Sequence, residues 1–411
     1  MSNLSDVLSA PVNLPKTIPD GWKWQSLVDV CRPKQWKTIS QNELTSTGFP
    51  VFGANGFIGY FREFNHAEET IAVTCRGATC GTVNLVPPKT YITGNAMCLD
   101  DVTEKTFIKY LYYAATYRTL SDAISGSAQP QITGDSLKFI NIPFPPLPEQ
   151  KKIASILTSV DEVIEKTQSQ IDKLQDLKKG TMNELLTKGI GHTEFKDSEL
   201  GRIPKSWEVK RLGDLIDSLT GGVSVNSENR TRNIDELGIL KTSCISKGEF
   251  FPAEHKAIFK TENGRANTPV EKDRIIFSRM NTPNLVGESG YVEHSEPDLF
   301  LPDRLWLLDV KDRQKTSMRW LSWLLASRDV RTQLTHIATG TSGSMKNISK
   351  PNLLLLPVRT PKIHEQNKIS SVITSVHSQI RKYQQKLHQT QSLKKSLMQD
   401  LLTGKVRVSV N

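Results

Sequence analysis

The clearest pattern in the chain is a pair of long segments that each carry one apolar stripe. In residues 148–190, isoleucine, valine and leucine recur at heptad spacing, with charged and polar residues between them, and residues 361–404 repeat the pattern. Neither segment has a proline in its interior, and Pro148 and Pro361 stand at their starts. We therefore predict two helices of about 40 residues, each roughly 60 Å long.

A single apolar stripe on a charged helix calls for a helical partner, and two such helices in one chain can supply each other. We predict an antiparallel intramolecular coiled coil, the alternative being that each helix packs only on its own globular domain. The residues expected to pack in it are Ile153, Val160, Leu174, Leu177, Ile369, Val376, Tyr383 and Leu393.

The two helices belong to an internal duplication. Residues 149–187 align without a gap with residues 365–403, and 19 of the 39 positions are identical. A second match relates Ile18, Pro19 and Trp22 to Ile203, Pro204 and Trp207. A repeat this long indicates a duplicated domain pair and not a solenoid.

The stretches before the two helices are rich in Gly, Pro and Asn turn signals between short β-prone runs. Each is predicted to be an α+β domain with a strongly bent sheet, with short helices near 104–123 and 316–334. The expected organisation is an N-terminal tail (1–17), a first domain (18–147), a helix (148–190), a linker (191–202), a second domain (203–360), a helix (361–404) and a C-terminal tail (405–411).

Composition is that of a folded protein with a modest basic excess. The 411 residues include 53 Lys+Arg and 43 Asp+Glu, which give a formal charge of +10, and 37% are hydrophobic. No run of 18 apolar residues and no basic-then-apolar leader occurs, so neither a membrane span nor export is expected. Five cysteines without a CxxC pair make a disulfide framework or a zinc site unexpected and favour a cytoplasmic location.

The positive charge is concentrated near the end of the chain. Residues 1–148 are neutral overall, whereas Lys and Arg exceed Asp and Glu by seven in residues 361–411. We therefore hypothesise that the second helix, through lysines such as Lys382 and Lys386, faces either DNA phosphates or an acidic partner surface.

Motifs for catalysis are missing from the sequence. There is no GxxxxGK[ST], GxGxxG, HExxH or GxSxG, and Asn281-Thr282-Pro283 only faintly resembles the motif that holds a flipped adenine. Each scattered histidine is more often a surface or core residue than a ligand, and Cys75 and Cys80 favour small buried cysteines over a reactive pair. No metal or cofactor is expected on this chain.

Glycine-rich turns place Arg, Asn and Gln where the backbone can approach a ligand closely. Arg can read guanine and Asn or Gln adenine through paired hydrogen bonds, while Lys suits phosphates. The alternative is that these residues only shape turns and cap strands. The candidates for DNA contact are Lys34, Lys37, Arg76, Asn95, Gln129, Gln131, Lys241, Arg279, Asn281, Arg304 and Lys346.

The arrangement resembles the specificity subunit of a type I restriction-modification system. The resemblance is carried by SELGRIPKSWEVKRLGDLI (198–216) and by the helix opening PPLPEQKKIASIL (145–157). FPVFGANGFIGY and TCRGATCGTV resemble one type of target-recognition domain, and LKTSCISKGEF, FSRMNTPNLVG and LPDRLW another. The second helix departs from the family pattern, because PKIHEQ (361–366) replaces PLPEQ.

This resemblance implies a non-catalytic protein that reads double-stranded DNA. It implies as partners two methyltransferase subunits, which carry S-adenosylmethionine, and up to two restriction subunits, which use ATP and Mg²⁺. Each recognition domain would read one half of a split, asymmetric target, with half-sites about one duplex turn (roughly 34–36 Å) apart and the helices as a ruler. The alternatives are a self-contained methyltransferase or nuclease, and a coiled-coil adaptor without a DNA role.

Overall fold

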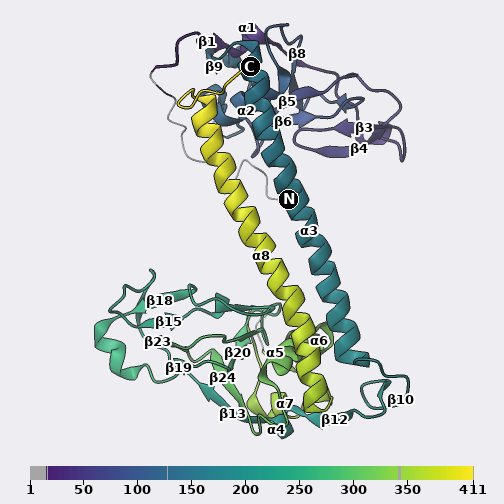
Figure 1. The fold of residues 1–411 in the computed structure, drawn as a ribbon, viewed down its shortest axis with the longest axis vertical. Helices are drawn as coiled ribbons and strands as arrows, with labels where there is room; N and C mark the ends of the chain where they lie inside the picture. The colour runs from purple at the N-terminus through teal and green to yellow at the C-terminus, as the bar shows by residue number, and fades with distance from the viewer. Residues whose placement is uncertain (1–14, 16, 127, 341–343, 411) are drawn as a thin grey trace. The chain divides into compact units, whose positions relative to one another are not determined.

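The computed structural model describes residues 15, 17–126, 128–340 and 344–410 (Figure 1). The chain divides into two units, one formed by residues 1–169 with 384–411 and the other by residues 170–383. Helices α3 (Leu147–Lys188) and α8 (Ile363–Leu402) each run from one unit into the other and confirm the two long helices predicted from the sequence. Of the predicted N-terminal tail, only residues 15 and 17 are described. No helix in the described part of the chain is long and apolar enough to cross a membrane.

The first globular domain contains two main sheets and a short ribbon. The larger sheet has the order β2-β8-β5-β6, with β2 Arg32–Gln35, β8 Ala96–Asp100, β5 Thr70–Thr74 and β6 Val83–Val86. The smaller has the order β4-β3-β7, with β4 Phe57–Phe61, β3 Phe49–Phe52 and β7 Tyr91–Ile92. The ribbon pairs β1 (Lys23–Ser26) with β9 (Asn141–Phe144). Its helices are α1 (Leu27–Val30), α2 (Ile108–Arg118), η2 (Gln41–Glu43), η3 (Ser121–Ala123) and η4 (Ser136–Phe139).

The second globular domain is also built on two main sheets. The first has the order β13-β24-β20-β22-β17-β16, with β13 Ile216–Gly221, β24 Leu305–Val310, β20 Ile275–Ser278, β22 Ser289–Tyr291, β17 Gly248–Phe250 and β16 Ile245–Ser246. The second has the order β14-β18-β15-β23-β19, with β14 Ser227–Glu228, β18 His255–Ile258, β15 Gly238–Leu240, β23 Glu296–Phe300 and β19 Pro269–Val270.

Among its described residues, three two-stranded pairs and six short helices complete this domain. The pairs are β10 (Phe195–Lys196) with β11 (Ile203–Pro204), β12 (Glu208–Arg211) with β26 (Pro357–Thr360), and β21 (Met280–Asn281) with β25 (Lys346–Asn347). The helices are α4 (Leu212–Leu215), α5 (Met318–Ala326), α6 (Arg328–Ile337), α7 (Lys350–Leu354), η5 (Thr242–Cys244) and η6 (Lys260–Arg265).

The expectation of one strongly bent sheet per domain is wrong. In the first domain, β7 and β8 follow each other along the chain but belong to different sheets. The turn at residues 93–95 separates them, and within it Gly94 packs so closely on the backbone of Trp36 that a Cβ would clash. The strand pairing is interrupted at this turn. As a result, β7 and β8 do not form one continuous strand but pair in two different sheets.

The two copies of the helix opening make the same contacts in their own units. Gln150 is fully buried, its Oε1 accepts from the Phe107 N–H at 2.8 Å, and its Nε2 donates to the carbonyls of Lys105 and Pro145. Gln366 is equally buried and repeats the pattern with the Ser317 N–H and the carbonyls of Lys315 and Pro361. The altered opening PKIHEQ thus retains the contacts of its Gln, because Gln366 makes the same bonds as Gln150.

The glutamate just before each buried Gln also makes the same contact in both copies. Trp22 Nε1 donates to Glu149 Oε2 at 3.2 Å, and Trp207 Nε1 donates to Glu365 Oε2 at 2.9 Å. The third partner differs: Arg407 binds Glu149, whereas His192 Nε2 lies 2.7 Å from Glu365 Oε1. The segment predicted as a C-terminal tail is therefore anchored at Arg407.

The two long helices pair antiparallel, as predicted, and the pairing can be followed within each unit (Figure 1). In the first unit, Ile153 and Leu157 near the start of α3 share a core with Met398 and Leu401 near the end of α8. In the second, Leu186 near the end of α3 shares a core with Ile369 and Ile373 near the start of α8.

The seam between the helices differs in detail from the predicted one. Ile153 and Ile369 are buried, and Val160, Leu174, Val376 and Tyr383 are half-buried. The predictions for Leu177 and Leu393 are wrong, because these side chains are 53% and 52% exposed. Polar side chains take places in the seam next to these leucines and elsewhere along it. Lys394, Thr167 and His377 are buried there, and Lys178 is half-buried. A pattern of apolar residues misplaces this part of the seam, because the lysines one position after Leu177 and Leu393 take the inward places.

Candidate nucleic-acid interface

Four of the candidate DNA-contacting residues in the first domain come together at one end of its larger sheet. Arg76 follows β5 and forms an isolated bridge with Gln131, and the Gly77 N–H donates to the Pro130 carbonyl at 3.2 Å. The carbonyl of Asn95 accepts from the Cys75 N–H, which brings the turn before β8 to the same place. We call the exposed set Arg76, Asn95, Gln129 and Gln131 the first polar edge.

The short loop that carries Gln129 and Gln131 is closed by the backbone. Ser125 and Gln131 exchange two hydrogen bonds, at 2.9 and 2.8 Å, so both ends of the loop are fixed. The side chains of Gln129 and Gln131 stay exposed. Because its ends are held, exposed amides at Gln129 and Gln131 can present hydrogen-bonding groups to a ligand at a reduced ordering cost.

The two lysines proposed as phosphate contacts in this domain occupy different surroundings. Lys34 lies on β2, half-buried, with its Nζ 3.6 Å from the centre of the Trp36 ring. Lys37 is exposed, and its carbonyl accepts from the Tyr91 hydroxyl at 3.0 Å. Neither is brought onto the first polar edge by a hydrogen bond or ion pair among the described residues.

Four candidates in the second domain also converge. The Arg279 N–H donates to the Arg304 carbonyl at 3.1 Å, just where β20 and β24 pair. The strand pair β21–β25 sets Asn281 opposite Lys346. We call Arg279, Arg304 and Lys346 the second polar edge.

Asn281 takes a structural part in this edge. It is only 8% exposed, its Nδ2 donates to Ser278 Oγ at 3.3 Å, and its Oδ1 accepts from the Thr282 N–H at 2.9 Å. Its amide thus holds the turn in this structure and does not face solvent. Lys241 lies apart from the edge, with its Nζ 3.8 Å from Glu254 Oε2.

Two residues that the sequence interpretation missed support the polar edges. Gln35 Nε2 donates to the Gly94 carbonyl at 3.0 Å and is exposed beside Asn95. Asn347 Oδ1 accepts from Arg279 Nε at 3.4 Å and so orients the guanidinium. Gln35 stands outside a glycine-rich turn and Asn347 follows a lysine, so neither had the turn pattern on which the candidates were chosen.

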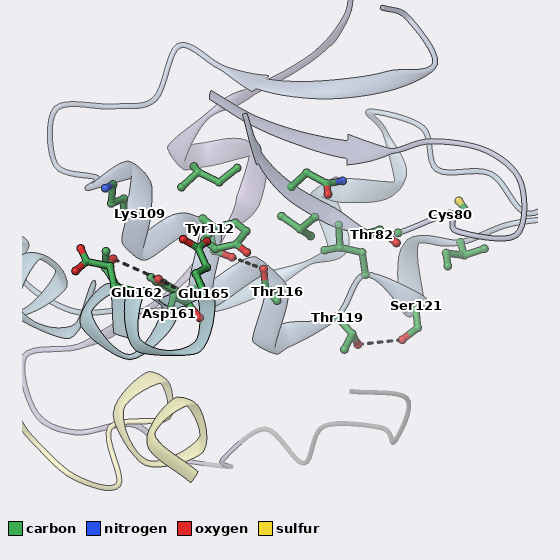
Figure 2. Close-up of a pocket in the computed structure, with 18 residues that line it drawn as sticks. Cys80, Thr82, Lys109, Tyr112, Thr116, Thr119, Ser121, Asp161, Glu162 and Glu165 are labelled. Carbon is green, nitrogen blue, oxygen red and sulfur yellow. Dashed lines mark hydrogen bonds between the residues drawn. The ribbon is translucent and has the colours of Figure 1, made fainter. Parts of the chain in front are cut away.

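A cavity of about 590 Å³ in the first unit is unsuited to a phosphate backbone (Figure 2). It lies between β6, α2 and α3, and the labelled carboxylates Asp161, Glu162 and Glu165 line one side. Burial, together with the charge of Asp161, raises the pKa of Tyr112 to about 12. Asp161 is paired with Lys394, but Glu162 and Glu165 are exposed and keep this side of the cavity acidic, so DNA is expected elsewhere.

The cysteines near the first polar edge carry protonated thiols. Burial raises the pKa of Cys75 to about 11 and also raises the pKa of Cys80. A thiol protonated at neutral pH is a poor nucleophile. These shifts agree with the interpretation of Cys75 and Cys80 as packing residues.

Comparisons with known proteins agree with the duplicated architecture. Residues 19–176 and 204–390 both match the family described as the type I restriction modification DNA specificity domain. The type I restriction enzyme MjaVIII specificity subunit of Methanocaldococcus jannaschii is 30% identical over 306 residues, which are 73% of this chain and 70% of that protein. The EcoEI specificity subunit of Escherichia coli is 27% identical over 199 residues, which are 47% of this chain and 33% of that protein.

Solved structures share the fold. The S subunit of a type I restriction-modification system from M. genitalium superimposes with a TM-score of 0.66 at 18% identity, covering 95% of this chain and 98% of its own. A chain from a structural study of complex assembly in the type I R-M system gives a TM-score of 0.52 at 16% identity and covers 95% of this chain and all of its own. Two family matches that together span most of the sequence, one on each half, place this chain in the family of type I restriction-modification DNA specificity domains.

Proposed function

We propose that this chain is the specificity subunit of a type I restriction-modification complex and that each recognition domain reads one half of a split DNA target. The observation that carries the proposal is a duplicated pair of domains, each with a polar edge of exposed or half-buried side chains: Arg, Asn and Gln in the first domain and Arg and Lys in the second. Arg76, Asn95 and Gln131 in the first domain and Arg279 and Arg304 in the second are the residue types that direct readout of bases requires. Membership of the DNA specificity family supports the same role.

The two half-sites are proposed to differ. The two polar edges are built differently, from loops around β5 and β8 in one domain and from β20, β21 and β24 in the other. Different side chains at different positions read different bases, so the target is asymmetric.

The chemistry is proposed to belong to partner subunits. In this proposal, methyltransferase subunits bring S-adenosylmethionine, restriction subunits bring ATP and Mg²⁺, and α3 and α8 form the scaffold on which they assemble. The chain itself supplies the sequence reading and the spacing between half-sites.

A map of methylated bases in the host genome, with and without this protein, tests the proposal. We expect a split motif to lose methylation when the protein is removed and to regain it on complementation. An unchanged methylation map would contradict the proposal.

A second experiment separates this proposal from a self-contained enzyme. The purified chain alone, incubated with DNA and either labelled S-adenosylmethionine or Mg²⁺, is expected to bind DNA without methylating or cutting it. Binding should weaken steeply as salt rises, because phosphate contacts release counterions. Turnover without partners would favour the enzyme, and salt-insensitive behaviour without DNA binding would favour a coiled-coil adaptor.

A further inference from the structure

Three side chains with metal-binding atoms meet inside the first recognition domain. Cys98 and Asp100 are two residues apart on β8 and therefore point to the same face of that strand. His66 reaches them from the segment between β4 and β5, and the candidate ligand atoms of the three residues lie within 4.8 Å of one another. His66 and Cys98 are buried, and the Asp100 side chain is only 10% exposed.

The orientation of His66 is determined by its neighbour Asn65. Asn65 Nδ2 donates to the Ile92 carbonyl at 2.9 Å, and Asn65 Oδ1 accepts from the Ile92 N–H at 2.8 Å, which fixes the amide group. Asn65 Oδ1 also lies 2.7 Å from His66 Nδ1. Since a carbonyl oxygen can only accept, Nδ1 carries the proton and Nε2 is left to face the other residues of the cluster.

His66 Nε2 lies 3.0 Å from Asp100 Oδ1. A neutral imidazole with its proton on Nδ1 would point a lone pair at the carboxylate, so a cation has to lie between the two acceptors, either a proton or a metal ion. Asp100 is oriented from its other side, because Trp36 Nε1 donates to Asp100 Oδ2 at 2.9 Å.

Cys98 favours the metal ion. The other three cysteines of this domain each donate to a backbone carbonyl: Cys31 to Leu27, Cys75 to Val73 and Cys80 to Cys75. Within the described residues, no hydrogen bond engages the Cys98 thiol, although it is fully buried beside a carboxylate and an imidazole. Metal binding would explain why this buried sulfur donates no hydrogen bond and lies next to an imidazole and a carboxylate.

We propose that His66, Cys98 and Asp100 bind a divalent cation of borderline softness, for which Zn²⁺ is the best match. One nitrogen, one sulfur and one oxygen ligand form a donor set typical of zinc. Zn–N and Zn–O bonds of about 2.0–2.1 Å in tetrahedral geometry separate the two atoms by roughly 3.3 Å, close to their present separation. A thiolate and a carboxylate balance the two positive charges, and Asn65 and Trp36 supply the outer hydrogen bonds that metal ligands usually have.

The cation would connect the two sheets of the domain. Asn65 bonds to Ile92 of β7 in the smaller sheet, and His66 bridges Thr90 next to it, whereas Cys98 and Asp100 belong to β8 of the larger sheet. The smaller sheet also carries the turn Gly53–Gly56, where Thr74 Oγ1 donates to the Ala54 carbonyl beside the first polar edge. The metal would therefore hold the smaller sheet in place against the larger one.

Titration of the full-length chain with Zn²⁺ after chelator treatment and buffer exchange tests the proposal. We expect one equivalent to bind and the melting temperature to rise with Zn²⁺ concentration. Cys98→Ser and His66→Gln should each weaken binding about 100-fold or more, and Trp36→Phe, which removes the outer hydrogen bond to Asp100 and leaves the three ligands in place, about 10–100-fold. Co²⁺ in place of Zn²⁺ should give a thiolate charge-transfer band that Cys98→Ser abolishes.

Cys31→Ser is the matched control, because Cys31 is a buried cysteine of the same domain with its own backbone partner. It should bind Zn²⁺ like the wild-type chain, and circular dichroism checks that each variant is folded. Equal Zn²⁺ affinity in the wild-type chain and folded Cys98→Ser, or no Zn²⁺-dependent stabilisation of the wild-type chain, would overturn the proposal in favour of a His66–Asp100 ion pair. Because these measurements use no DNA, their outcome is independent of the proposed function.

Discussion

At the residue scale, Arg279 shows how a readout group can be held ready. Its N–H is bound by the Arg304 carbonyl, its carbonyl accepts from the Ile348 N–H at 2.8 Å, and Asn347 Oδ1 accepts from Nε. With backbone and Nε fixed, the outer nitrogens of the half-buried guanidinium remain for a ligand. Such preorganisation lowers the entropy lost on binding.

We expect Arg279→Ala to weaken binding to the cognate DNA by about 1–3 kcal/mol and to relax one base position, if the side chain reads a base. Competition between cognate and singly altered duplexes measures both effects. Arg265→Ala is the control, because Arg265 is an exposed arginine of the same domain that pairs with Glu262. Uniform weakening on every sequence would make Arg279 a phosphate contact, and no change would exclude both roles.

His377 makes the stability of the fold depend on pH, and the direction of this dependence follows from the shift of its pKa. Burial, together with the charge of Lys178 nearby, lowers the pKa of His377 to about 3. In the unfolded chain the group takes up a proton near pH 6.5, so the unfolded state binds more protons between about pH 3 and 6.5. The stability that His377 contributes is therefore present above pH 6.5 and is lost as the pH falls.

We expect the free energy of unfolding to fall by up to about 1.4 kcal/mol per pH unit below pH 6.5 on account of this residue. His377→Gln should flatten that slope in denaturant titrations at pH 5, 6 and 7. His364→Gln, which changes an exposed histidine of the same helix, should leave it as in the wild type. Equal slopes for all three proteins would contradict the assignment.

The sequence predicts which residue types the proposed DNA-contacting site holds, but not the role of each residue. Arg76, Asn95 and Gln131 were chosen because forked side chains in glycine-rich turns suit base reading, and the structure brings them to one edge. Asn281 had the same pattern, yet its amide binds Ser278 and Thr282. An Asn or Gln side chain uses the same amide group to hold a local turn or to contact a base. The residue type alone therefore does not show which of the two roles it has.

At the scale of the elements, the long helices were the easiest to predict and their seam the hardest. Heptad spacing and the flanking prolines gave both helices to within two residues at each end. Their contacts depend on buried polar groups such as Lys394 and His377, which a hydrophobic pattern omits. In the first domain, the split into two sheets falls at the turn that holds Gly94, and the close approach of Gly94 to Trp36 is a tertiary contact that strand propensity does not contain.

The helix pair predicts how target spacing responds to length. Inserting one heptad at matched positions in α3 and α8 adds about 10.5 Å to each helix while preserving the seam. We expect the unread gap between half-sites to lengthen by about three base pairs, at 3.4 Å each, with both half-sites unchanged. A methylated-motif map of cells carrying the variant measures the gap, and a seven-residue insertion beside the exposed Ile234 is the control. An unchanged gap would contradict the ruler role.

At the scale of the whole molecule, the two copies share one set of structural contacts but differ in their charge. Both units keep the Trp–Glu contact, the buried Gln and a lysine of one helix facing the other. The excess positive charge breaks this equivalence, because it belongs to the second helix and the segment after it. Lys382 and Lys386 on α8 are exposed, and neither forms an ion pair within the described residues.

Reversing both lysines, Lys382→Glu with Lys386→Glu, tests what this charge faces. If it faces phosphates of the unread gap, DNA affinity should fall on every sequence and the salt slope should decrease by about two, with subunit assembly intact. Salt-dependent DNA binding and size-exclusion chromatography of the assembled complex measure the two effects. Lys196→Glu with Lys272→Glu, two exposed lysines outside the long helices, is the matched control. Lost assembly with intact DNA binding would instead place an acidic partner surface on α8.

The buried lysines of the helix seam have a consequence for which surfaces these helices can accept. Lys394 is 3% exposed and pairs with Asp161, and its counterpart Lys178 lies 3.2 Å from His377 Nδ1. Any shifted or foreign pairing would leave a buried ammonium without an acceptor, at a cost of several kcal/mol. A leucine at either position would remove that cost and so allow the helix to associate with the wrong helix. We therefore expect these lysines to disfavour pairing of either helix with a second copy of itself, at some cost in stability.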